Sequence, residues 1–155
     1  MVDKIQIIPV QGLPLIKEGD DIAQMIVSAA EKQGTPIQEG DVIVITHVMV
    51  SKAEGNIINL DTVQPSEFAK TIAKQTEKDP ALVEIVLREA KSIARMRNGN
   101  IITETKHGWY CANSGVDRSN VPGERNVTPL PTDADKSAAE VRNKIKEITG
   151  KDIAV

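Results

Sequence analysis

The sequence predicts a mixed α/β domain that spans residues 1–155 as a single unit. A chain of 155 residues, 40% of them hydrophobic, is long enough to bury one substantial core. Several segments place apolar residues three and four positions apart, which indicates amphipathic helices. Other segments are short β-branched runs, which are typical of strands. Both kinds of element are therefore expected in one fold.

The N-terminal part of the chain predicts two strands with a helix between them. Residues 4–10 are expected to form a strand near a sheet edge, because their proline cannot donate to a ladder. An aspartate at position 20 or 21 caps a helix that runs to about Lys32. Residues 41–50 are apolar on both faces and predict a central, buried strand, against which residues 56–60 pair back.

The rest of the chain predicts three helices and two short strands before its last residues. A proline-serine pair opens the first helix, and an aspartate-proline pair opens the second. A long irregular segment, residues 113–130, precedes the final helix, which stops at a glycine. The predicted ranges are 66–75, 80–94 and 135–149 for the helices and 101–105 and 109–112 for the strands.

Residues 151–155 resemble the start of a buried strand that is then interrupted. An apolar strand start at a free carboxyl end leaves an incomplete ladder. We therefore expect an incomplete domain, the N-terminal portion of a longer protein; the alternative is a frayed tail after a helix.

Composition excludes several classes of protein. Lysine and arginine total 19 against 22 aspartate and glutamate, and this net charge of −3 argues against a general nucleic-acid or membrane-surface binder. Aromatic residues make up only 2%, too few for stacking on single-stranded nucleic acid. The single cysteine excludes a disulfide framework and fits a reducing compartment. With no export signal and no membrane-length apolar run, we expect a soluble, cytoplasmic protein.

The densest polar segment is residues 112–120, in the loop after the predicted 109–112 strand. Asp117 is a hard oxygen ligand of the kind that Mg²⁺ or Mn²⁺ requires, and Asn113, Ser119 and Asn120 add groups suited to a phosphate, ribose or purine edge. The alternative is an ordinary loop in which these side chains satisfy local backbone groups.

Lys52 follows the predicted 41–50 strand, at the carboxyl edge where α/β sheets bind ligands, and is placed to meet an anion. The alternative is a solvated turn lysine paired with Glu54. His47 lies inside the apolar run, where a structural role is the simpler interpretation, and Cys111 is expected to pack as a small hydrophobe. The sequence has no GxxxxGK[ST] motif, so a nucleotide site would be built differently from a P-loop.

Five blocks of the sequence resemble the coenzyme F-420 gamma-glutamyl ligase family and occur in the family's order. The SKAEG and GVDRSN segments within them are specific enough to make chance agreement improbable. The blocks are GLPLIKEGDD at 12–21, GDVIVITHVMVSKAEG at 40–55, LREAKSIARM at 87–96, ITETKHG at 102–108 and CANSGVDRSNV at 111–121.

The resemblance implies a non-P-loop, gamma-glutamyl ligase-like fold, a homodimer, and a GTP-dependent ligase. Such an enzyme adds L-glutamate to the deazaflavin coenzyme F-420 precursor, and then a gamma-linked glutamate, through an acyl phosphate with release of GDP and phosphate. It uses Mg²⁺ or Mn²⁺, because phosphoryl transfer depends on positioning and charge neutralisation.

The resemblance also assigns roles to individual residues. Asp117 matches a metal-binding aspartate, and Lys52 and Asn120 match GTP-contacting residues. At His47 and Val48, where many members carry small hydroxyl residues, it implies nucleotide contact through the backbone. The N-terminal nucleotide loop of the family matches Leu13, Pro14, Leu15 and Ile16.

Members of this family are longer, and their next block, a strand with an Asp-Thr metal-binding turn, would follow Val155. The alternative to an active ligase is therefore a non-catalytic nucleotide- or coenzyme-binding module, or an inactive fragment of the enzyme.

Overall fold

The computed structural model describes residues 4–155 and has mixed α/β architecture, as the sequence predicts. Its strands are short and its sheets are small and antiparallel. The elements in chain order are α1 (Ile22–Lys32), α2 (His47–Ala53), β1 (Ile58–Asn59), the 3₁₀ turn η1 (Leu60–Thr62), α3 (Glu67–Thr76), α4 (Pro80–Glu89), β2 (Ala90–Arg97), β3 (Asn100–Thr105), β4 (Tyr110–Ala112), the 3₁₀ turn η2 (Asn113–Gly115), β5 (Asn126–Val127) and α5 (Ala134–Thr149).

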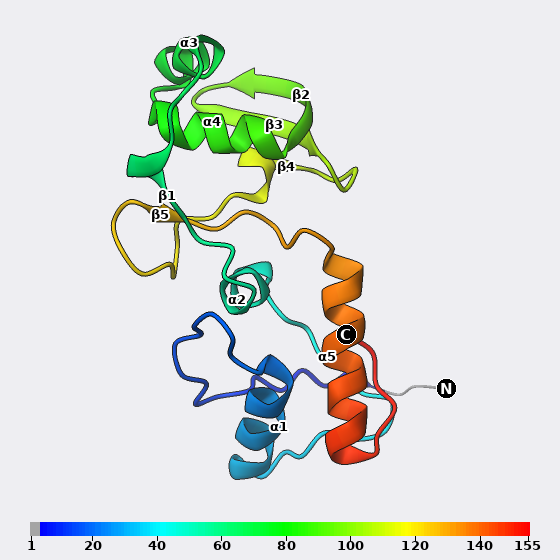
Figure 1. The fold of residues 1–155 in the computed structure, drawn as a ribbon. Helices are drawn as coiled ribbons and strands as arrows, with labels where there is room; N and C mark the ends of the chain where they lie inside the picture. The colour runs from blue at the N-terminus through cyan, green and yellow to red at the C-terminus, as the bar shows by residue number, and fades with distance from the viewer. Residues whose placement is uncertain (1–3) are drawn as a thin grey trace.

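One half of the molecule is built around the three-stranded sheet β2-β3-β4, and Figure 1 shows α3 and α4 beside that sheet. Alternate residues of β3 turn inward, so Ile101, Thr103 and Thr105 are almost fully buried. The hydrophobic cluster of this half joins both helices, β3, η1 and β5. Its buried members are Leu60, Ala69, Ile72, Ala73, Ala81, Leu82, Val83, Ile85, Val86, Ile101, Val116 and Val127.

The other half contains α1, α2 and α5, and the C-terminus lies in it (Figure 1). A second cluster fills the space between α1 and α5, with Ile26, Val27 and Ile145 at most 3% exposed. The extended residues 41–45 run past this cluster and meet the C-terminal segment in a single parallel bridge, Val42 to Ala154. The two halves thus have separate hydrophobic cores, and the prediction of a single domain over residues 1–155 stays a prediction.

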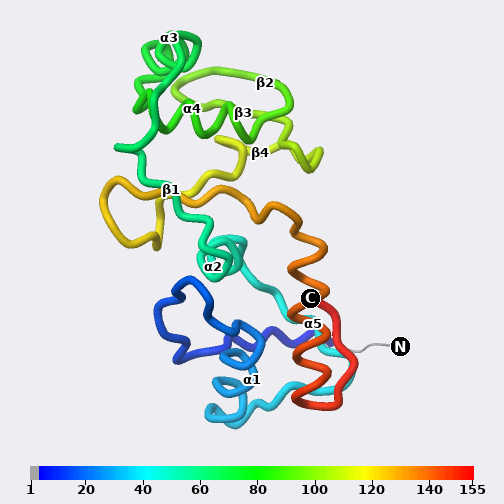
Figure 2. Tube along the Cα trace, viewed as in Figure 1, coloured from blue at the N-terminus to red at the C-terminus, as the bar shows by residue number. Residues whose placement is uncertain are grey.

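The chain crosses between the halves twice: Figure 2 shows one crossing that leaves α2 toward β1 and another that leads down into α5. The outgoing segment forms β1 and the returning segment forms β5, which pair antiparallel with Ile58 opposite Val127. After β5 the chain packs on α2, where the buried Ser51 hydroxyl donates to the Pro129 carbonyl at 2.8 Å. The segment between β4 and α5 is therefore held by both halves.

The predicted helices with clear caps are confirmed. Asp21 accepts from the Gln24 amide at the start of α1, and Ser66 accepts from the Ala69 amide at the start of α3. Asp133 caps α5, which ends at Gly150 with a φ of 71°. The strands around His107 and Gly108 are confirmed as β3 and β4.

Three strand predictions in the N-terminal part are wrong. Residues 4–10 form no strand, and Ile5 and Ile7 are each 89% exposed, because no described segment pairs with them. Residues 41–50 are not a central buried strand: α2 begins at His47, and Val44 is 90% exposed. An apolar run of this length fits a helix as well as a strand. The segment 56–60 pairs with β5 instead.

Two further boundaries differ from the prediction. The helix expected over residues 80–94 ends at Glu89, and β2 begins at Ala90, so Ile93 packs from a strand and not from a helix. Residues 151–155 are predicted to begin a buried strand. Ile153 is indeed only 5% exposed, but Ala154 pairs with Val42 in a single isolated bridge and no strand forms. No helix within residues 4–155 combines the length and apolarity needed to cross a membrane.

Arg125 ties the irregular segment to the sheet-containing half through two carboxylates. It forms an ion pair with Asp79, the N-cap of α4, and another with Asp61 at 2.8 Å. Burial alone would raise the pKa of Asp79, but Arg125 and the amides of Ala81 and Leu82 outweigh burial, and the pKa of this carboxyl lies below its ordinary value of 3.8.

We expect Asp79→Asn to lower the free energy of unfolding by about 1 kcal/mol at neutral pH, because asparagine still caps the helix but does not pair with Arg125. A carboxylate whose pKa is lowered by folding stabilises the folded state at pH values above its ordinary pKa. This stabilisation is lost as the pH falls through the pKa of the folded state. The difference in the free energy of unfolding between variant and parent, measured with urea, should therefore narrow as the pH falls below 3.8, the ordinary pKa of an aspartate. A difference that stays constant down to acid pH would contradict this account. Asp61→Asn, at a carboxylate that is 63% exposed, is the control and should have a smaller effect.

Candidate functional site

Lys52 is a buried cation on α2. Lys52 is only 4% exposed, and its ammonium group donates a hydrogen bond to the Asn120 carbonyl at 3.0 Å. Within residues 4–155 Lys52 forms no ion pair, and Glu54 instead accepts from Ser137. The sequence predicts Lys52 in a turn after a strand, with a pairing to Glu54 as the alternative interpretation. Both are wrong: Lys52 lies in a helix and Glu54 binds Ser137. Because an ammonium has three donors and one is used here, Lys52 can still bind an anion.

Asp117 lies across a short antiparallel bridge from Thr128. The two residues exchange both backbone hydrogen bonds, at 2.9 and 2.8 Å, so their side chains share one face of the bridge. The carboxylate accepts from the Ser119 amide at 2.6 Å. Burial tends to raise the pKa of Asp117, but hydrogen bonds from Ser119 and the electrostatic effect of nearby His47 together lower this pKa by more than burial raises it. Asp117 is therefore held in the ionised form.

His47 is the first residue of α2 and neighbours Asp117. Its Nε2 atom is buried and has no hydrogen-bond partner in the part of the chain that the structure describes. Val48, the next residue, is 8% exposed. His47 lies four positions before Ser51, so the two side chains lie on the same face of α2. Ser51 on this face binds the Pro129 carbonyl, just after β5.

A strained turn leads into the Asp117 bridge. Asn113 and Ser114 adopt left-handed φ angles of 51° and 54°, which side-chain-bearing residues avoid. The buried Ser114 hydroxyl holds the turn, donating to the Val86 carbonyl at 2.7 Å and lying 2.9 Å from the Thr103 hydroxyl. Gly115, with a φ of 73°, completes it beside Leu130. The start of the loop is thereby fixed to α4 and β3.

The loop with Leu13, Pro14, Leu15 and Ile16 is attached to both α1 and α2. Ile16 is buried, whereas Leu15 is 76% exposed. Leu13 and Pro14 line a hollow of about 540 Å³ against α1. At its far end the Gly19 amide donates to the Ala53 carbonyl at 2.9 Å, one residue from Lys52. The loop thus ends beside α2, while the 117–120 turn meets α2 at Lys52.

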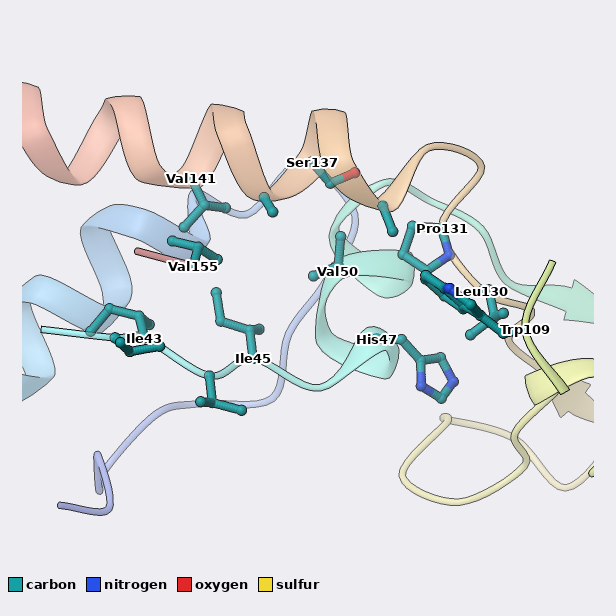
Figure 3. A pocket seen from close by; sticks show the side chains of 14 residues that line it. Ile43, Ile45, His47, Val50, Trp109, Leu130, Pro131, Ser137, Val141 and Val155 are labelled. Atoms are coloured by element: carbon teal, nitrogen blue, oxygen red, sulfur yellow. The ribbon is translucent and has the colours of Figure 1, made fainter. Parts of the chain in front are cut away.

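An apolar groove of about 320 Å³ adjoins His47 (Figure 3). Residues 42–45 form one wall and α5 the other, and Trp109 and Leu130 lie at the same end as His47. Trp109 is 50% exposed and stacks on His107 with ring centroids 5.2 Å apart. His47 therefore lies between an apolar surface and the charged groups around Asp117.

The donor set around Asp117 fits one kind of metal ion. No group of three or more His, Cys, Asp and Glu residues gathers anywhere in residues 4–155. Mg²⁺ takes one or two carboxylates and completes its shell with phosphate oxygens and waters. A carboxylate beside the unpartnered Thr128 hydroxyl fits such a cation carried with a phosphate ligand. Zn²⁺ sites, by contrast, use several His or Cys ligands.

The structure brings predicted site residues together in two pairs. The Lys52 ammonium meets the Asn120 carbonyl, and His47 lies near Asp117; Val48, on the same helix as Lys52 and His47, is buried. The N-terminal loop reaches only the end of α2. Sequence reasoning missed Ser51 and Thr128: Ser51 stands in the SKAEG block, but only its tertiary contact with the Pro129 carbonyl shows what it does, and Thr128 stands in no motif. Cys111 is partly buried, which raises the pKa of its thiol and agrees with a packing role.

This geometry defines a mixed α/β protein in which α2 meets the 117–120 turn, with Lys52 buried against the Asn120 carbonyl and His47 near the ionised Asp117. The profile of the F-420-0:gamma-glutamyl ligase family matches residues 12–155, and the chain belongs to that family. It is 48% identical over 151 residues to a coenzyme F-420:L-glutamate ligase of Methanothermobacter thermautotrophicus, covering 97% of this chain and 60% of the relative.

Two further relatives carry the same name. The protein from Methanopyrus kandleri is 48% identical over 149 residues, which is 94% of this chain and 57% of the relative. The protein from Methanocaldococcus jannaschii is 42% identical over 152 residues, which is 98% of this chain and 58% of the relative. The chain thus spans about three-fifths of the length of these curated relatives.

Gly115 provides a test of the turn that positions Asp117. A Cβ atom at this residue would come within 2.8 Å of the Leu130 side chain, in addition to its left-handed φ. We expect Gly115→Ala to lower the free energy of unfolding by about 1–3 kcal/mol more than Gly34→Ala. Gly34 is the matched control, because it has a φ of 78° but no atom within 4 Å of its added Cβ. Equal losses in chemical denaturation would show that the contact with Leu130 is not constraining.

Proposed function

We propose that this protein acts in the GTP-dependent ligation of L-glutamate to the deazaflavin coenzyme F-420 precursor. Family membership and relatives named coenzyme F-420:L-glutamate ligases support glutamate ligation to this coenzyme. GTP as the energy source, an acyl-phosphate intermediate, a divalent cation and a homodimer are parts of the proposal. The chain covers about three-fifths of its relatives, so the activity proposed is that of the whole protein.

The observation that carries the proposal is the buried, unpaired ammonium of Lys52. A charge removed from water is costly unless an opposite charge or strong hydrogen bonds compensate it. In residues 4–155 one carbonyl, that of Asn120, is its hydrogen-bond partner, and no carboxylate pairs with it. A triphosphate would supply the missing negative charge. Lys52 would then act as a fixed point charge beside the phosphates.

The remaining residues suit the same ligand. The 117–120 turn places Asn120 next to Lys52, and the ionised Asp117 is two residues from Ser119, whose amide it binds. Mg²⁺ or Mn²⁺, when bound at Asp117, would neutralise charge on the phosphates. These groups position and neutralise; none of them is required as a nucleophile, in keeping with the demands of phosphoryl transfer.

The proposed reaction has two steps. A carboxylate of the precursor attacks the γ-phosphorus of GTP, which forms an acyl phosphate and releases GDP. The amino group of glutamate then attacks the acyl carbon, phosphate leaves, and the amine proton passes to solvent. The apolar groove is lined by His47 but not by Lys52, Asp117 or Asn120.

Removing the charge of Lys52 should weaken nucleotide binding. We expect Lys52→Met to raise the Kd for GTP about 10- to 100-fold, because a charge-assisted hydrogen bond contributes about 1.5–3 kcal/mol. Isothermal titration calorimetry measures this directly. Lys74→Met is the matched control, since Lys74 lies exposed on α3 and its loss changes the net charge equally. An unchanged Kd for Lys52→Met would remove the anion site from the proposal.

Ligase activity can be tested by mass spectrometry. The protein, incubated with the deazaflavin precursor, L-glutamate, GTP and Mn²⁺, should yield a product heavier by one glutamate residue together with GDP. We expect Asp117→Asn to abolish GDP formation while unfolding at nearly the temperature of the parent, because the side-chain oxygen of asparagine can still accept from the Ser119 amide.

Two results would contradict the proposed function. One is the absence of product and GDP in the parent protein under these conditions, which would favour a binding module or an inactive fragment. The other is undiminished Mn²⁺-stimulated turnover in Asp117→Asn, which would place the metal elsewhere.

A further inference from the structure

We infer that Thr128 is a positioning residue for Asp117. The two residues are directly opposite each other in an antiparallel bridge and exchange both backbone hydrogen bonds. Side chains of such a pair lie on the same face, with Cβ atoms about 5 Å apart. The bridge therefore places the Thr128 side chain next to the Asp117 side chain on one face, although no hydrogen bond joins them in this structure.

The Thr128 hydroxyl has no partner here, although it is completely buried. Thr128 is 0% exposed, and its Oγ1 atom makes no hydrogen bond to any residue in the range 4–155. Buried hydroxyls are almost always paired, and leaving one unpaired destabilises a protein. The buried threonines elsewhere in the fold follow this rule: the hydroxyl of Thr76 donates to the Ile72 carbonyl at 2.8 Å.

The backbone of Thr128 is secured independently of its side chain. The bridge to Asp117 holds one side, and the Ser51 hydroxyl binds the carbonyl of the next residue, Pro129. Valine, which has the same branched shape and no hydroxyl, would keep these contacts. The orphan hydroxyl is therefore not needed to place the chain, and its position beside a carboxylate points to a role in the site.

The role follows from the proposed function, on which this inference rests. When the Asp117 carboxylate turns toward a divalent cation, one of its oxygens can accept a hydrogen bond from Thr128. That bond would orient the carboxylate, and forming it would satisfy the buried hydroxyl only in the bound state. Residues that orient a ligating carboxylate typically change metal affinity about 10- to 100-fold when they are removed.

The test measures Mn²⁺ affinity and thermal stability in the same proteins. We expect Thr128→Val to raise the Kd for Mn²⁺, measured by calorimetry in the presence of GTP, by about tenfold or more. Its melting temperature should equal or exceed that of the parent, because an unpaired buried hydroxyl has been removed. Thr128→Ser keeps the hydroxyl and should bind Mn²⁺ nearly as well as the parent. Thr76→Val is the control: it loses a satisfied hydrogen bond, so its melting temperature should fall while its Mn²⁺ affinity stays unchanged.

The outcomes separate this inference from the proposed function. If Asp117→Asn abolishes Mn²⁺ binding but Thr128→Val binds as the parent does, the positioning role is overturned and the metal site stands. If Thr128→Val loses affinity only together with a lower melting temperature, or Thr128→Ser fails to restore binding, the hydroxyl is structural. If the parent binds no Mn²⁺, both the metal site and the role of Thr128 are overturned.

Discussion

Burial of the Lys52 ammonium is the constraint on which the arrangement of the site depends. Its helix, α2, has only seven residues and no side-chain N-cap, so it is not stable by itself. Its place is determined by contacts with segments distant in sequence: Lys52 with Asn120, Ser51 with Pro129, and the Asn56 amide with the Leu130 carbonyl at 3.2 Å. The same contacts that hold the helix also bring the lysine to the loop that carries Asp117. Structure and site are therefore coupled through one short helix.

The loop between β4 and α5 is fixed from both halves of the molecule. Ser114 anchors its start to α4, and Arg125 binds the carboxylate that caps the same helix. The returning segment then packs on α2 in the other half. Asp117 lies between these anchors and keeps its charge because backbone and side-chain donors favour the ionised form. Such a loop can present a carboxylate without first paying the entropy of ordering itself, which is the general advantage of a preorganised site.

Local sequence signals predicted the helices better than the strands. The caps of α1, α3 and α5 and the turn between β3 and β4 follow from residue chemistry a few positions apart, so they could be recognised without the fold. The run over residues 41–50 could not, because its apolar residues suit a strand and a helix equally, and only tertiary contacts decide where α2 begins. For the site, the polar residues of the 112–120 loop, the position of Lys52 and the resemblance to a family drew attention to Lys52, Asp117 and Asn120. The burial of Lys52 and the pairing of Asp117 with Thr128 depend on contacts 68 and 11 positions apart, respectively, and no local pattern encodes them.

The most direct measurement is a crystal structure of the protein with a non-hydrolysable GTP analogue and Mn²⁺. Our account predicts a phosphate oxygen about 2.8 Å from the Lys52 ammonium and Mn²⁺ coordinated by the Asp117 carboxylate. It would be contradicted by a nucleotide bound elsewhere, with Lys52 still paired only with the Asn120 carbonyl and Asp117 directed into solvent.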